Sequence, residues 1–176
     1  MSSHGHYIIK IVLLGEANVG KTSLVYRFIE NKFRENYQST LGVNLLKKDM
    51  KLEDFGEVSA QIWDLGGQES FKSLRKLYLE GANGALIVYD CTKKKTFEKL
   101  SSWMQDFKQA RGNEPIVLIG NKSDLKDKIK VPDSDGIKLA KSNNMEFIST
   151  SAKTGSNVEG AFIEITKKIL NKNISG

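Results

Sequence analysis

The chain has 176 residues, the size of one domain, and such a chain can bury about 70% of its unfolded surface on folding. Apolar residues make up 39% and charged residues 27%, a balance that excludes disordered, collagen-like and coiled-coil proteins. No apolar run approaches the roughly 18 residues that a membrane-spanning helix needs. The single cysteine, Cys91, excludes an intrachain disulfide and fits a reducing compartment.

The net charge of +6 does not point to a nucleic-acid-binding protein. The lysines stand in short groups spread along the chain, and no aromatic residues interleave with them. This distribution favours a solvated surface, with a weak anionic contact as the alternative. We therefore expect no nucleic-acid partner.

Apolar runs alternate with helical periodicity from Tyr7 onward. Strands are expected over 7–14, 43–52, 58–64, 84–89, 115–119 and 145–148. Helices are expected from Gly20, over 97–107, over 137–141 and over 158–169. The second and third strands, joined by a tight turn, are expected to pair antiparallel. The order predicts one α/β domain over 1–176, an open and mostly parallel sheet with helices on both faces.

The segment after the first expected strand matches the phosphate-loop pattern G-x-x-x-x-G-K-[ST]. Its glycines let backbone N–H groups surround phosphate oxygens, and the helix that follows adds the positive end of its dipole. Lys21 can reach the β- and γ-phosphates, and the Thr22 hydroxyl can bind Mg²⁺. An ordinary glycine-rich turn is the alternative. The residues expected to bind are Gly15, Ala17, Asn18, Val19, Gly20, Lys21, Thr22 and Ser23.

The segment after the third expected strand carries a second candidate group, Asp64, Gly67 and Gln68. The Asp64 carboxylate can hold Mg²⁺ through water, and the Gly67 N–H can donate to a γ-phosphate. Gln68 can orient an attacking water. Alone, the pattern D-x-x-G indicates a turn. Beside a phosphate loop it indicates a nucleotide site.

The segment after the fifth expected strand predicts the choice of base. An ionised Asp124 only accepts hydrogen bonds. Guanine presents two adjacent donors, N1–H and the 2-amino group, whereas adenine presents neither at these positions. Asp124 therefore favours guanine. The Lys122 stem can cover the ring, and Asn121 can tie this loop to the phosphate loop.

Two further segments can complete the site. Ser151, Ala152 and Lys153 follow the sixth expected strand, and the Ala152 N–H can donate to guanine O6. Phe33 and Thr40 lie in a polar, unperiodic stretch between the first helix and the second strand. Phe33 can lie edge-on to the base, and Thr40 offers a second hydroxyl ligand for Mg²⁺. Taken singly, each is an ordinary loop residue.

These segments, in this order and spacing, resemble the Ras-superfamily small GTPases over a core of residues 7–170. Residues 39–43, 60–64 and 86–90 resemble the Rab branch, whereas Asp-Leu-Gly-Gly-Gln at 64–68 looks like the Arf branch. The resemblance implies a P-loop NTPase fold. It implies a six-stranded, mostly parallel sheet with one antiparallel strand and about five helices on both faces.

The resemblance also implies a monomeric switch that binds GTP or GDP with Mg²⁺ and hydrolyses GTP slowly. Lys21 and Gln68 would be catalytic, and Thr22, Thr40 and Asp64 would surround the metal. The alternative is a GTP-binding interaction module with negligible hydrolysis. A nucleotide kinase is disfavoured because it needs an arginine-rich lid, and the chain has only four arginines.

The partners implied are an exchange factor, a GTPase-activating protein and effectors. They would act through two mobile segments, 33–43 and 66–79. We expect a role in membrane trafficking or signalling and a cytoplasmic location. Membrane association is expected only if a lipidated tail follows Gly176 in the natural protein.

Overall fold

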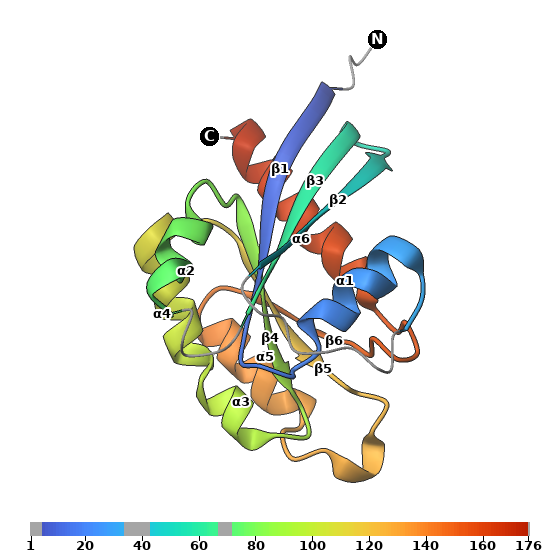
Figure 1. Ribbon diagram of the computed structural model, residues 1–176, viewed down its shortest axis with the longest axis vertical. Coiled ribbons are helices and arrows are strands. Elements are labelled where there is room, and N and C mark those ends of the chain that lie inside the picture. Colours follow the sequence, from blue (N-terminus) through green and yellow to red (C-terminus); the bar gives the residue numbers. More distant parts are fainter. Residues whose placement is uncertain (1–4, 34–42, 67–71, 176) are drawn as a thin grey trace.

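The computed structural model describes residues 5–33, 43–66 and 72–175 and contains one six-stranded sheet (Figure 1). The strands lie in the order β2-β3-β1-β4-β5-β6. Their bounds are β1 (Gly5–Leu14), β2 (Val43–Leu52), β3 (Gly56–Leu65), β4 (Gly84–Asp90), β5 (Ile116–Asn121) and β6 (Glu146–Ser149). The β2–β3 pair is antiparallel and the other four pairs are parallel, which confirms the expected sheet.

The described residues form six α-helices and one short 3₁₀ turn. The helices are α1 (Lys21–Glu30), α2 (Lys72–Leu79), α3 (Lys94–Glu98), α4 (Leu100–Arg111), α5 (Asp133–Ser142) and α6 (Val158–Ser175), and the turn is η2 (Lys126–Lys128). Only Lys99 separates α3 from α4, so the set agrees with the expected count of about five helices. Helix α2 lies within 66–79, where the periodicity predicted no helix.

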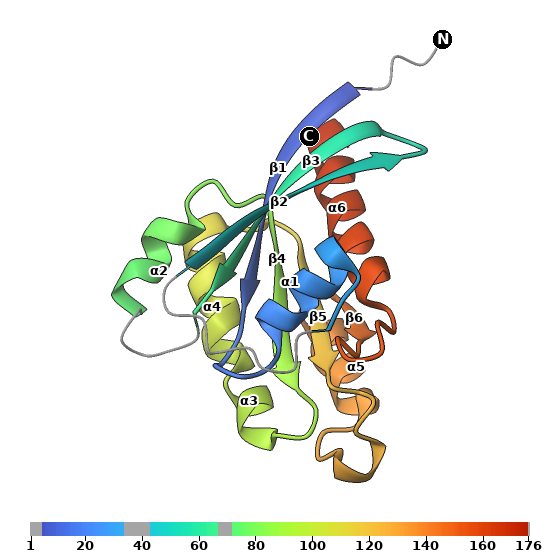
Figure 2. The ribbon, with the colours of Figure 1, turned by 45° about the vertical axis from the view of Figure 1, so that its right-hand side comes forward.

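The helices cover both faces of the sheet (Figures 1 and 2), and two apolar cores lie between them and the sheet. Helices α1 and α6 pack on one face, where the Phe28 and Phe162 rings stack with centroids 4.3 Å apart. Helices α2, α4 and α5 pack on the other face around Trp103 and Phe107. Every residue of β4 is buried because this central strand has helices on both sides. These helices do not cover the carboxyl-terminal edge of the sheet, and the described loops that follow the parallel strands lie there.

Two smaller features complete the fold. Cys91 is buried just after β4, and this burial raises the pKa of its thiol to about 11. Among the described residues, no helix is long and apolar enough to cross a membrane.

Candidate nucleotide-binding site

The phosphate loop between β1 and α1 has a backbone that only glycine can adopt at two positions. Gly15 and Gly20 have φ of 146° and 103°. A Cβ at Gly15 would lie 2.2 Å from the Val88 carbonyl oxygen, and one at Gly20 would lie 2.3 Å from Asn121 Nδ2. The motif glycines therefore let the loop fold tightly against the ends of β4 and β5.

Lys21 is buried inside this loop. Its Nζ donates to the Gly15 and Glu16 carbonyl oxygens, each at 2.9 Å. Burial lowers the pKa of Lys21 to about 8, although the carboxylates of Asp64 and Glu16 act in the opposite direction. The site therefore places a desolvated ammonium where anionic phosphate oxygens would restore its full charge.

Thr22 and Asp64 meet beside the lysine. The Thr22 hydroxyl donates to Asp64 Oδ2, and both side chains are buried. A hydroxyl and a carboxylate are the hard oxygen ligands that Mg²⁺ prefers, so this donor set fits the ion. The part of the chain that the structure describes has no cluster of three or more His, Cys, Asp or Glu able to form an all-protein metal site. Phosphate and water would supply the remaining ligands.

A cavity of about 320 Å³ opens next to the phosphate loop, and it collects most of the residues predicted to bind the nucleoside. Its lining comes from four separate segments: Asn18, Gly20, Ser23, Phe33, Asn121, Lys122, Asp124, Leu125, Ala152 and Lys153. Leu125 is the one member that the sequence reasoning missed. It follows Asp124 directly, so its position beside the base loop could have indicated it.

Asn121 joins the loops around this cavity. Its Nδ2 donates to the Val19 carbonyl oxygen at 3.0 Å, which ties the end of β5 to the phosphate loop as predicted. Its Oδ1 accepts from Thr150 Oγ1 at 3.0 Å and from the Ala152 N–H at 3.3 Å. The Ala152 N–H, expected to face guanine O6, thus donates weakly to Asn121 in this structure.

Lys122 spans the cavity wall with a strained backbone. Its φ is 71°, and its Nζ pairs with Asp90 Oδ2 at 2.9 Å and donates to the Asn18 carbonyl oxygen at 2.8 Å. Asp90 is buried and also accepts from the Thr92 N–H and hydroxyl. The sequence reasoning missed Asp90, although it stands directly after β4 at the same sheet edge.

Ser151 acts on the predicted base-selecting carboxylate. Its hydroxyl donates to Asp124 Oδ1 at 2.8 Å and accepts from the Thr154 N–H at 3.1 Å. Ser151 was predicted to bind the nucleotide, but it does not line the cavity. The structure places it behind Asp124, where it orients the carboxylate.

The remaining predicted residues fall into two groups. Val19 is buried, and its side chain packs in the core beneath the phosphate loop. Ala17 is half-buried, and Ser23 lines the cavity. Thr40, Gly67 and Gln68 lie outside the described residues. The structure therefore describes the predicted residues around the phosphate loop and the cavity, and the roles of Thr40, Gly67 and Gln68 stay predictions.

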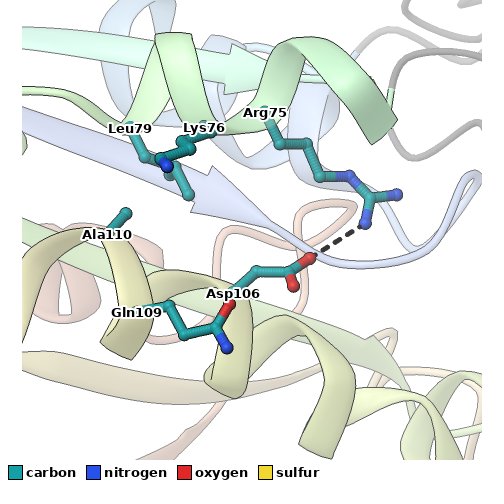
Figure 3. Close-up of a pocket in the computed structure, with 6 residues that line it drawn as sticks. All are labelled: Arg75, Lys76, Leu79, Asp106, Gln109 and Ala110. Atoms are coloured by element: carbon teal, nitrogen blue, oxygen red, sulfur yellow. Dashed lines mark hydrogen bonds and ion pairs between the residues drawn. The ribbon is translucent and has the colours of Figure 1, made fainter.

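A second cavity, of about 340 Å³, lies between α2 and α4 (Figure 3). It is lined by Arg75, Lys76, Leu79, Asp106, Gln109 and Ala110. Arg75 Nη1 pairs with Asp106 Oδ2 at 3.1 Å across it. None of the residues predicted to bind nucleotide lines this cavity.

The fold and the first cavity together define a phosphate-loop nucleotide-binding protein. The loop, its buried lysine and the base-side loops all stand at the carboxyl edge of a mostly parallel sheet, where ligands bind in such folds. The sequence model of the Ras family matches residues 10–171. The chain therefore belongs to the Ras family and is a small GTPase of the Ras superfamily.

Proposed function

We propose that this protein binds GTP and GDP with Mg²⁺ and hydrolyses GTP slowly as a regulatory switch. The observation that carries the proposal is the Asp124 carboxylate, held by Ser151 at the edge of a cavity continuous with the phosphate loop. Family membership supports a guanine-nucleotide switch in general. The specific activity of this chain is our proposal.

The phosphate end of the site binds by electrostatic attraction. Lys21 would exchange its two carbonyl acceptors for β- and γ-phosphate oxygens, and the helix dipole of α1 would add to the attraction. Thr22 and Asp64 would hold Mg²⁺, with Thr40 as the predicted second hydroxyl. When bound, Mg²⁺ neutralises negative charge on the phosphate oxygens.

Guanine selection is tested by competition. Wild-type protein should bind GTP far more tightly than ATP, because adenine offers no pair of donors to Asp124. Asp124→Asn should weaken GTP binding and favour xanthosine nucleotides, since xanthine has O2 where guanine has the amino group. Equal affinity of the wild type for ATP and GTP would disprove the assignment.

Slow hydrolysis follows from the groups available to stabilise the transition state. Gln68 is proposed to position the attacking water, but residues 35–43 contain no arginine that could act in cis. The lack of such an arginine costs about 10³ to 10⁵ in rate. Phosphate release from pre-loaded protein should therefore take on the order of many minutes, and Gln68→Leu should slow it further without weakening GTP binding. No detectable release would favour the interaction-module alternative.

Regulators and effectors are proposed to act through 33–43 and 66–79. Support comes from the exposed side chains of Leu74 and Leu77 on α2 and of Leu45 on β2, which offer apolar area near both segments. A pull-down comparing the GDP form with a GTP-analogue form tests this proposal. Thr40→Ala should retain GDP affinity and lose the GTP-selective partners.

The finer classification is also a proposal. Residues 39–43 and 60–64 resemble the Rab branch, and the Asp-Leu-Gly-Gly-Gln segment resembles the Arf branch. We propose on that basis a monomeric cytoplasmic switch in trafficking or signalling. Microscopy of the tagged natural protein tests the location.

A further inference from the structure

The Arg27 guanidinium joins α1 to the loop between β6 and α6. Its Nε donates to the Ala152 carbonyl oxygen at 2.8 Å, and its Nη2 donates to the Lys153 carbonyl oxygen. Its Nη1 donates to the Asn31 carbonyl oxygen at 3.3 Å, at the end of α1. One side chain therefore bonds to backbone from two segments that are far apart in the sequence.

These two segments carry opposite ends of the nucleotide site. Helix α1 begins with Lys21 at the phosphate end, and Arg27 lies less than two turns further along the same helix. Ala152 and Lys153 line the base cavity. The guanidinium therefore connects the phosphate half of the site to the base half by charge-assisted hydrogen bonds.

The Arg27 side chain lies outside the cavity proposed to hold the base. It does not line the base cavity, so it is a positioning residue and not a ligand-binding one. The loop that it holds turns tightly, with the Gly155 N–H donating to the Ser151 carbonyl oxygen at 2.8 Å. Because Ser151 in turn orients Asp124, the loop's position affects both the cavity wall and the base-selecting carboxylate.

A separate apolar contact keeps α1 and α6 together without Arg27. The Phe28 and Phe162 rings stack with an interplanar angle of 1°. A variant that loses the Arg27 hydrogen bonds would still have this stack and the surrounding core. The arginine is therefore needed for the placement of the loop more than for the packing of the helix.

We propose that Arg27 holds the 151–155 loop against the guanine cavity and thereby sets how long a nucleotide stays bound. This inference rests on the proposed guanine-nucleotide binding. Without the two carbonyl acceptors held in place, the loop moves away from the base more often. The nucleotide then leaves faster from its base end, while the phosphate and metal end is unchanged.

The experiment measures the dissociation of a fluorescent GDP on adding excess GDP. GDP should dissociate from Arg27→Gln on the order of tenfold faster than from wild type, since the two charge-assisted bonds to the 151–155 loop are lost. Arg27→Lys, which can remake one of them, should fall between. The matched control is Arg111→Gln, because Arg111 Nε also donates to a carbonyl oxygen, that of Ala82 at 2.7 Å, but away from the cavity. It should leave the rate unchanged.

A second readout separates positioning from general loosening. EDTA should speed release by the same factor in wild type and Arg27→Gln, because the arginine acts on the base end and independent effects multiply. Three results would each overturn the inference. A folded Arg27→Gln variant could release GDP at the wild-type rate, or Arg111→Gln could accelerate release as much as Arg27→Gln does. The factor by which EDTA accelerates release could also differ between wild type and Arg27→Gln. Wild-type protein that retains no GDP would instead disprove the proposed function.

Discussion

Trp103 Nε1 donates a hydrogen bond to Glu16 Oε1 at 3.1 Å, so α4 contacts the phosphate loop directly. The same indole ring carries the Arg75 guanidinium 3.7 Å from its centroid. Arg75 in turn pairs with Asp106 (Figure 3). One buried aromatic side chain thus links the loop proposed to bind phosphate with α2, in one of the two segments proposed to meet partners.

The first prediction concerns this indole. Trp103→Phe keeps an aromatic ring beneath Arg75 but removes the donor to Glu16 and leaves a small void. We expect the free energy of unfolding to fall by about 2 kcal/mol. Urea denaturation of the GDP-free protein measures it.

The matched control is the same substitution at the other tryptophan. Trp63 Nε1 is buried and makes no hydrogen bond to any residue that the structure describes. Trp63→Phe therefore loses ring volume without losing a bond, and it should cost less than Trp103→Phe. Equal costs would show that the Glu16 bond contributes nothing.

The elements that could be predicted from sequence are those whose motifs stand next to buried strands. The ends of β1, β3 and β5 are marked by the phosphate loop, by Asp64 and by Asn121, and the structure brings all three together. The apolar runs were long enough to identify each strand to within about two residues of its observed bounds.

Helix α2 could not be predicted because its burial opposes the usual pattern. Leu77 is 60% exposed, whereas Arg75 is only 7% exposed because it lies on Trp103 and pairs with Asp106. In the usual amphipathic pattern the leucine would be buried and the arginine exposed. Likewise, two of the bonds from Arg27 go to backbone carbonyls more than a hundred residues away, and a backbone acceptor leaves no mark in the sequence.

The second prediction contrasts two glycines. Gly20→Ala would bring a methyl group 2.3 Å from Asn121 Nδ2 and would strain a φ of 103°, so the Asn121–Val19 bond should break and GDP binding should be lost. Gly160→Ala in α6 meets no atom within 4 Å and should stabilise the protein by about 0.5 to 1 kcal/mol. Calorimetry of both variants checks this. Normal GDP binding by Gly20→Ala would contradict it.

The third prediction tests the support of Asp124. Ser151→Ala removes the hydroxyl that donates to Asp124 Oδ1, so the carboxylate is less well oriented toward a base. GDP affinity should fall about tenfold, the loss expected for one hydrogen bond to a charged group. The control is Ser142→Ala, whose hydroxyl donates only to the Leu139 carbonyl oxygen on α5. If both variants bind GDP equally well in titration calorimetry, Ser151 has no role in base binding.

The last prediction uses the lowered pKa of Lys21. In the folded protein, without nucleotide or Mg²⁺, this pKa is about 8, against 10.5 in the unfolded chain. Between these values the unfolded state binds more protons, so the free energy of unfolding should rise with pH from 8 to 10.5. Below pH 8 both states are protonated, and the full cost of burying the charge is present.

Lys21→Met lacks this titration and serves as the reference. Tyrosine ionisation is common to both proteins and cancels in the difference between their unfolding free energies. The unfolding free energy of wild type minus that of Lys21→Met should rise by about 3 kcal/mol as the pH rises from 8 to 10.5. Urea denaturation at pH 7, 8, 9 and 10 measures it. A difference that stays flat would mean that the buried ammonium is fully compensated by its carbonyl acceptors and by Asp64, and that phosphate binding is not driven by relief of its desolvation.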